Sequence, residues 1–118
     1  KRQGQSFLTL EPGRAVAFMT DDALLYGERA KANNPADWIV VGKAQSRESY
    51  GCMIRKDDPQ FKKLSDTVIT GMMKDGAVNT LYTKWFMQPV PPKGLNLDFP
   101  LSEDMKTLIK APNDKALD

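Results

Sequence analysis

The segment Gly13–Tyr26 constrains the fold more than any other part of the chain. It reads GRAVAFMTDDALLY: a short apolar run, Ala15–Met19, is followed by Asp21 and Asp22 and then by residues that favour a helix at about 23–32. An apolar run of this kind is typical of a strand that is buried on both faces of a parallel sheet. The order of strand, acidic turn and helix therefore predicts an α/β unit.

A second apolar run extends this unit. Asn33, Asn34 and Pro35 are expected to end the first helix, and Trp38–Val41 then predicts another strand. Two strands that are joined by one helix form a βαβ unit, and its strands are usually parallel. Ahead of the unit, Ser6 predicts only a short capped turn.

A third strand is predicted after a polar stretch. Residues 42–49 are polar and indicate a linker, and Tyr50–Arg55 then places Tyr50, Cys52 and Ile54 on one face of an alternating pattern. Alternation with a period of two is the signature of a strand.

Three helices are predicted in the second half of the chain. Asp58 followed by Pro59 combines an N-cap with proline at the first helical position, so a helix is expected over 58–74. Another is expected over 77–86, and a last short helix begins after Ser102. The apolar stripes of the first two, which predict core contacts, consist of Phe61, Leu64, Val68 and Met72 on one and Val78, Leu81, Tyr82, Trp85 and Phe86 on the other.

Composition narrows the function classes. The 118 residues include no histidine and one cysteine, so His-based triads, Cys-His dyads and the usual zinc sites are excluded. No nucleophile stands beside a base, so the chain is predicted not to be an enzyme and to need no cofactor or metal. The net charge of +2 is spread among both signs, and this predicts no nucleic-acid partner.

Several longer stretches carry a family resemblance. The chain closely resembles the periplasmic glutamate/aspartate-binding proteins of ABC transporters, within the polar amino-acid solute-binding family. The PPKGLNL and PNDKALD segments are typical of the dicarboxylic subgroup. The stretches are GRAVAFMTDDALLYGERAKA, VVGKAQSRESYGCMIRKDDPQFKKL, KWFMQPVPPKGLNL and APNDKALD.

The resemblance implies an incomplete α/β fold. Family members have the type II periplasmic-binding-protein fold, with two lobes around a ligand cleft, and this chain resembles their carboxyl-terminal portion. Residues 1–45 would then be the end of lobe 2, residues 46–50 the hinge crossing, and residues 51–118 the carboxyl-terminal part of lobe 1 with an extended tail. The two lobes are incomplete and joined by a hinge strand, so the two parts are expected to share no core.

The resemblance also implies a function. The chain would be part of the solute-binding component that captures L-glutamate or L-aspartate by hinge closure. Its other partners would be the membrane subunits of the transporter and the missing amino-terminal segment, from the same protein or from another chain. The location would be the periplasm, reached with a signal peptide that this chain does not contain. The alternative is a stand-alone structural or protein-interaction fragment that binds no ligand of its own.

Asp21 and Gln3 are the predicted ligand-binding residues. An aspartate at the end of the first strand is expected, by the resemblance, to accept hydrogen bonds from the ligand's α-ammonium group. Its alternative role is a helix cap, with Asp22 as the other candidate for that role. Gln3 lies where related proteins often carry a histidine that contacts the ligand's side-chain carboxylate, and its amide donates without a positive charge.

Other candidates favour structural roles. Arg14 and Arg55 are expected to be solvated rather than to clamp a carboxylate. The aromatic residues of the 77–86 stripe are expected in a core. Cys52 is expected to be buried on its strand, or to form a disulfide with a cysteine in the missing segment.

Overall fold

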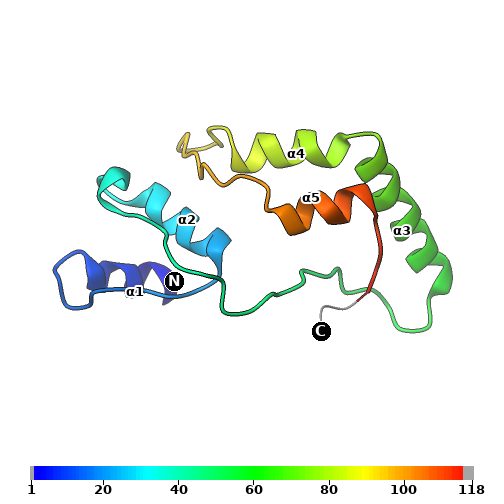
Figure 1. Ribbon diagram of the computed structural model, residues 1–118. Helices are drawn as coiled ribbons and strands as arrows, with labels where there is room; N and C mark the ends of the chain where they lie inside the picture. The colour runs from blue at the N-terminus through cyan, green and yellow to red at the C-terminus, as the bar shows by residue number, and fades with distance from the viewer. Residues whose placement is uncertain (1, 116–118) are drawn as a thin grey trace. The chain divides into compact units, whose positions relative to one another are not determined.

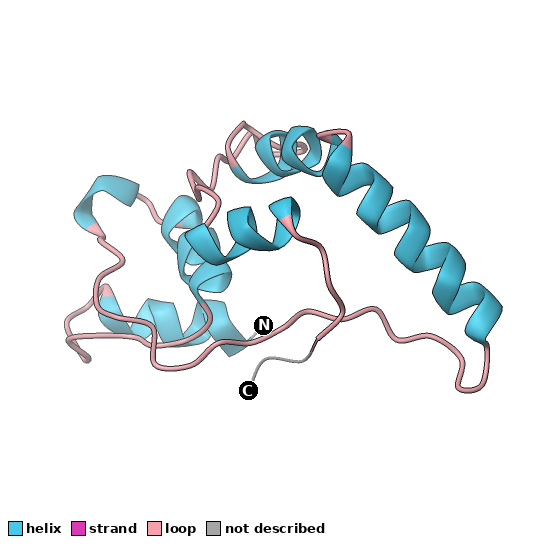
Figure 2. Cartoon of the chain, turned by 45° about the vertical axis from the view of Figure 1, so that its right-hand side comes forward, coloured by secondary structure: helices cyan, strands magenta, loops and turns pink. Residues whose placement is uncertain are grey.

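The computed structural model describes residues 2–115, in which the regular elements are helices (Figures 1 and 2). They belong to two compact units. The first unit holds the residues up to Gly42 together with Lys84–Pro100, and the second holds Lys43–Thr83 together with the residues from Leu101 onward. The elements in chain order are α1 (Arg2–Leu10), α2 (Asp22–Lys31), the 3-10 helix η1 (Pro35–Asp37), α3 (Pro59–Lys74), α4 (Ala77–Phe86) and α5 (Glu103–Lys110).

The four helices predicted from capping and periodicity are confirmed as α2, α3, α4 and α5. The Asp58 side chain accepts a hydrogen bond from the Phe61 N–H at 3.0 Å at the start of α3. Ser102 does the same for the Met105 N–H at 3.2 Å at the start of α5. Gly76 adopts a φ of 85° between α3 and α4, a left-handed conformation that glycine accepts without steric cost. These signals are local, which is why the sequence reveals them.

Helix α1 corrects the expectation of a short turn capped by Ser6, because Ser6 lies inside a helix that begins at Arg2. Packing accounts for the helix. Helix α1 contacts α2, and the Phe7 ring meets the Trp38 ring edge-on, with centroids 5.0 Å apart. Phe7 is 9% exposed, so this contact buries it almost fully.

The strands predicted at 15–19, 38–41 and 50–55 are wrong for this structure, in which all three runs are extended or irregular. In the described part of the chain, pairing is limited to an isolated antiparallel bridge between Val90 and Leu95. A strand exists only when a neighbour accepts its backbone hydrogen bonds. Residues 2–115 supply no such neighbour to these runs, so the two-lobed α/β organisation stays a prediction.

The proline-rich segment after α4 folds back on itself. The Val90 N–H donates to the Leu95 carbonyl at 3.0 Å, and the Asn96 amide donates to the Met87 carbonyl at 3.3 Å. The Phe99 N–H donates to the Phe86 carbonyl at 3.1 Å. These bonds fix Phe99 at the end of α4.

Aromatic contacts therefore join distant parts of the first unit. The Phe99 ring lies against Tyr26 of α2 and edge-on to Phe86 of α4. Tyr26 and Phe99 therefore belong to one compact unit, although the predicted domain bounds assign them to different lobes, and that domain division stays a prediction.

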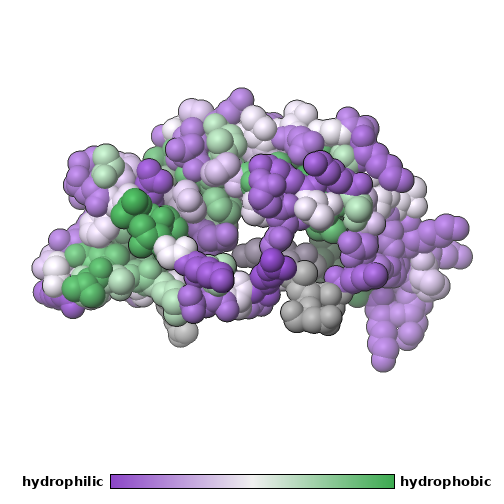
Figure 3. Space-filling view, viewed as in Figure 1, coloured by the Kyte–Doolittle hydropathy of each residue, from purple (hydrophilic) through white to green (hydrophobic). Residues whose placement is uncertain are grey.

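The core of the second unit lies between α3 and α5. Ile109 of α5 is 9% exposed, and α5 packs against α3. The stripe on α3 differs from its predicted role: Phe61, Leu64 and Val68 are 49%, 57% and 51% exposed. The described residues do not provide the layer that would cover the α3 stripe. On the face drawn in Figure 3, the clearest apolar side chains, in green, lie over α1 and α2 of the first unit.

Candidate functional site

Asp21 lies immediately before α2, and its side chain makes no capping hydrogen bond. Its carbonyl oxygen performs the local structural role, accepting from the N–H groups of Leu24 and Leu25 at 3.1 and 3.0 Å. The carboxylate is on an exposed residue. The side chain is therefore open to accept hydrogen bonds from a cationic group.

The Asp22 side chain makes a hydrogen bond to the backbone at the start of α2. Its Oδ1 accepts a hydrogen bond from the Ala23 N–H at 2.7 Å. A negative charge in the first turn also interacts favourably with the helix dipole. Of the two aspartates, only Asp22 therefore uses its carboxylate to bind the first turn of α2, whereas the Asp21 carboxylate makes no capping bond.

Gln3 lies in the first turn of α1 and is half-buried. The close approach of α1 to α2 occurs beside it: a β-carbon built on Gly4 would lie 3.5 Å from Oε2 of Glu28. Gln3 and Asp21 thus stand at the amino-terminal ends of two helices that pack together in the first unit. The two predicted binding residues belong to one pair of helices.

Glu28 lies at the contact between α1 and α2, and the sequence analysis does not single it out. Its side chain is only 12% exposed, and Oε1 pairs with Nζ of Lys31 at 2.9 Å. The Glu-x-x-Lys spacing on a helix is a signal for such a pair. Its low exposure comes from α1, which lies against it at Gly4, and sequence spacing does not reveal that contact.

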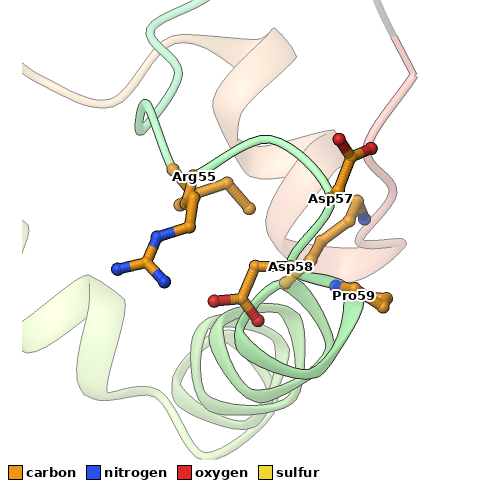
Figure 4. Close-up of a pocket in the computed structure, with 6 residues that line it drawn as sticks. Arg55, Asp57, Asp58 and Pro59 are labelled. Carbon is orange, nitrogen blue, oxygen red and sulfur yellow. The ribbon is translucent and has the colours of Figure 1, made fainter.

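The second unit contains an open hollow of about 510 Å³ at the start of α3, lined by Ile54, Arg55, Asp57, Asp58, Pro59 and Lys62. Figure 4 shows the Arg55 and Asp58 side chains on the same side of the hollow and the Asp57 carboxylate pointing away from them. Arg55 is exposed, as predicted. Neither Asp21 nor Gln3 lines this hollow.

Lys62 at the hollow's edge has acidic partners. Its Nζ lies 2.6 Å from Asp66 and 2.8 Å from Asp114. The hydrogen bonds to Asp114 and then Asp66 raise the pKa of Lys62, and the same contact with Lys62 lowers the pKa of Asp114. The ammonium group is therefore already neutralised, so this hollow does not offer Lys62 as a strong anion ligand.

The remaining candidates lie on the surface. Arg14 is exposed, in agreement with its predicted solvation. Trp85 is 48% exposed, with Nζ of Lys84 5.2 Å from its ring centroid, so its predicted core role is wrong. Cys52 is exposed and free, which contradicts its predicted burial, because residues 50–55 form no sheet. Its pairing with a cysteine outside this chain stays a prediction.

Residues 2–115 contain neither a cluster of metal-ligating side chains nor a membrane-spanning helix. No three carboxylate, thiol or imidazole side chains in this range come together as metal ligands. Within the same range, no helix has the length and apolar character needed to cross a bilayer.

Comparison with known proteins gives close relatives. No protein-family model matches the chain. The chain is 62% identical over 117 residues, 99% of its length, to the glutamate/aspartate import solute-binding protein of Escherichia coli (strain K12). It is 62% identical over 116 residues, 98% of its length, to the L-glutamate/L-aspartate-binding protein of Pseudomonas aeruginosa. An ABC transporter glutamine-binding protein of Bacillus subtilis (strain 168) is 29% identical over 71% of the chain and 30% of its own length.

These matches confirm the resemblance inferred from the sequence motifs. The relatives are named as binding proteins of amino-acid transport and not as enzymes. The chain spans about two fifths of the length of the first two relatives, 39% and 38%.

Proposed function

We propose that this chain is the carboxyl-terminal portion of a solute-binding protein that captures glutamate or aspartate for an ABC importer. The observation that carries the proposal is the 62% identity over 99% of the chain to the Escherichia coli protein. Function depends on particular side chains and not on the fold alone, so identity over nearly every position is a stronger argument than a shared architecture. The chain performs no chemical step in this role.

The proposed architecture has two α/β lobes. Residues 1–45 close lobe 2, residues 46–50 cross the hinge, and residues 51–118 return to lobe 1. The extended runs at 15–19 and 50–55 support this architecture, because they are apolar or alternating segments that lack partner strands among the described residues. A chain that spans about two fifths of its relatives leaves those partners to the rest of the protein.

The proposed ligand contacts are Asp21 and Gln3. The Asp21 carboxylate is exposed and makes no capping bond, so it is open to accept charge-assisted hydrogen bonds from the ligand's α-ammonium group. Gln3 stands at the start of the helix that packs on α2, and its amide can donate to the ligand's side-chain carboxylate.

Hinge closure provides the proposed mechanism. A ligand that contacts both lobes binds the closed state more tightly than the open state, and this difference in affinity shifts the population toward closure. The closed protein would then present its ligand to the membrane subunits of the importer in the periplasm.

The test is calorimetry on a completed protein. The polypeptide that precedes the matched residues in the Escherichia coli relative would be joined to this chain, and the fusion titrated with glutamate, aspartate and glutamine. We expect binding of the two acidic amino acids, much weaker binding of glutamine, and no measurable binding by the 118-residue chain alone. A fusion that melts cooperatively but binds neither acidic amino acid would refute the proposed function.

The second candidate is a protein-interaction fragment that binds no ligand of its own. The observation that favours it is the exposure of large apolar side chains such as Val16 and Met53, at 103% and 99%. The same titration separates the two candidates, because an interaction fragment confers no amino-acid binding on the fusion.

A further inference from the structure

The contact between α1 and α2 places a carboxylate beside Gln3. A β-carbon built on Gly4, the next residue along α1, would lie 3.5 Å from Oε2 of Glu28. Gln3 and Gly4 are both half-buried, and the Glu28 side chain is only 12% exposed. A charge with so little water around it is screened less than one on the open surface. The negative charge of Glu28 therefore acts on a group that is bound at Gln3.

Helix α2 sets which end of the proposed ligand lies near this charge. Asp21 directly precedes α2, and Glu28 lies about two turns further on, which corresponds to about 10 Å along the helix axis. In the proposed function, Asp21 holds the α-ammonium group of the ligand and Gln3 holds its side-chain carboxylate. The carboxylate of Glu28 is therefore near the side-chain end of the ligand.

The charge of Glu28 opposes an acidic ligand. Two carboxylates repel each other, and the repulsion grows as the surroundings become less aqueous. Glutamine has the shape of glutamate without its side-chain charge, so Glu28 alone would favour glutamine. A site that prefers the acidic amino acids needs a positive charge that offsets Glu28.

Lys31 supplies that positive charge. Its Nζ lies 2.9 Å from Oε1 of Glu28, and the other oxygen of the carboxylate faces Gly4. The two residues are one turn apart on the same face of α2, a spacing at which opposite charges attract. The pair as a whole is neutral, so it removes most of the repulsion that Glu28 would exert at Gln3.

We propose that Lys31 determines ligand specificity: by neutralising Glu28 beside Gln3, it allows the site to prefer a side-chain carboxylate over the uncharged amide of the same shape. This inference rests on the proposed function and deepens it. Lys31 acts through Glu28 rather than by touching the ligand, so it is a positioning residue for the charge of the site. Its side chain is 59% exposed, so a substitution there leaves the packing of α1 against α2 in place.

The experiment compares glutamate and glutamine binding by the completed fusion and by its Lys31→Met variant. Methionine removes the charge and keeps an apolar chain of similar length. We expect the Kd for glutamate to rise by roughly tenfold, because like charges that are brought together lower affinity strongly. The Kd for glutamine, measured by calorimetry at high ligand concentration, should change by less than about twofold. The preference for glutamate should therefore fall by roughly tenfold.

Two control variants separate a local charge effect from a general one. Lys31→Arg keeps the positive charge and should keep the preference for glutamate. Lys93→Met removes the same charge from an exposed position in the first unit and should change the preference by less than about twofold. A loss of preference in Lys93→Met as large as that in Lys31→Met would overturn the proposal.

A double variant tests whether Lys31 acts through Glu28. Glu28→Gln combined with Lys31→Met leaves no charge to offset, so it should recover the preference for glutamate that Lys31→Met loses. A merely structural role of Lys31 would weaken both ligands equally and would not be rescued in this way. Equal losses for the two ligands, or a double variant as impaired as Lys31→Met, would overturn the proposal.

The specificity role and the proposed function fail in different ways. If the parent fusion folds but binds neither acidic amino acid, the proposed function is refuted and the role of Lys31 falls with it. If the parent fusion binds glutamate and Lys31→Met keeps the parental preference, the role of Lys31 alone is refuted and the proposed function stands.

Discussion

The ring centroids of Tyr26 and Phe99 lie 4.7 Å apart, and the two ring planes meet at an angle of 35°. Phe99 also meets Phe86 edge-on at 6.2 Å. The pair joins α2 to the segment that follows α4, and both belong to the first compact unit. Aromatic pairs at these centroid distances contribute stability beyond the area that they bury.

Phe99→Ala should destabilise the first unit. The substitution removes both ring contacts and leaves Tyr26 less covered, so we expect a loss of about 1–2 kcal/mol, below the range for a fully buried phenylalanine. Thermal unfolding followed by circular dichroism measures the loss. Phe61→Ala, at a position that is 49% exposed, is the control and should change stability by less than about 0.5 kcal/mol. If the two variants lost equal stability, the Tyr26–Phe99 contact would contribute no more to stability than a half-exposed phenylalanine does.

Asp58→Ala should destabilise α3 by about 1 kcal/mol, because the Phe61 N–H loses its acceptor. Asp58→Asn keeps an oxygen that can accept the same hydrogen bond, so its free energy of unfolding should lie within about 0.5 kcal/mol of that of the parent chain. Urea unfolding monitored by the helical signal compares the three proteins. If the asparagine variant is as unstable as the alanine variant, the Asp58 charge matters rather than the cap.

Asp114 should titrate at an unusually low pH. Its hydrogen bond to Lys62 lowers its pKa below the ordinary value of about 3.9. A lowered pKa in the folded state means that the contribution to stability is present above the unfolded pKa and is lost as the pH falls through the folded value. Carboxyl chemical shifts in an NMR titration measure the pKa directly.

Lys62→Met is the control for this titration, and it should return the pKa of Asp114 toward its ordinary value. Added salt should weaken the shift, since both side chains are at least half exposed. A low pKa that survives Lys62→Met would assign the shift to another cause.

Asp21→Asn should weaken acidic amino-acid binding in the completed fusion by roughly 2–5 kcal/mol, the range for removing one partner of a buried charge pair. Asparagine caps helices about as well as aspartate, and the Asp21 side chain makes no cap bond, so the melting temperature should not change. Calorimetry and a melting curve on the same sample measure both quantities. Asp22→Asn is the matched control and should leave affinity intact, and an Asp21→Asn protein with parental affinity would remove Asp21 from the ligand site.

The sequence predicts the helices well because their signals lie within a few residues. The N-cap at Asp58, the proline after it and the glycine at position 76 each act on adjacent backbone groups. The strands depend on partners, so the apolar run at 15–19 does not become a strand where the described chain supplies no neighbour. The sequence does not predict helix α1, because its local signals are weak and the packing of Phe7 against Trp38 supports it instead.

In the candidate site, too, features that depend on adjacent residues are predictable and features that depend on distant contacts are not. The position of Asp21 at the start of α2 is predictable, because it depends on the adjacent helix. The low exposure of Glu28 depends on the approach of α1 at Gly4, and no spacing in the sequence encodes that contact. The exposure of Cys52 has a similar origin, since its expected burial depends on a sheet that the described residues do not form.

The two compact units are interleaved along the chain, which passes from one to the other after Gly42, after Thr83 and after Pro100. The second of these passages occurs inside the continuous helix α4. A protease that cuts once in the polar stretch 43–49 would therefore not release the first unit whole, because residues 84–100 would stay covalently joined to the second unit while residues 1–42 would be held only by noncovalent contacts. Nor can either unit be produced by simple truncation: a gene that stops at Gly42 omits Phe99, and with it the ring that covers Tyr26.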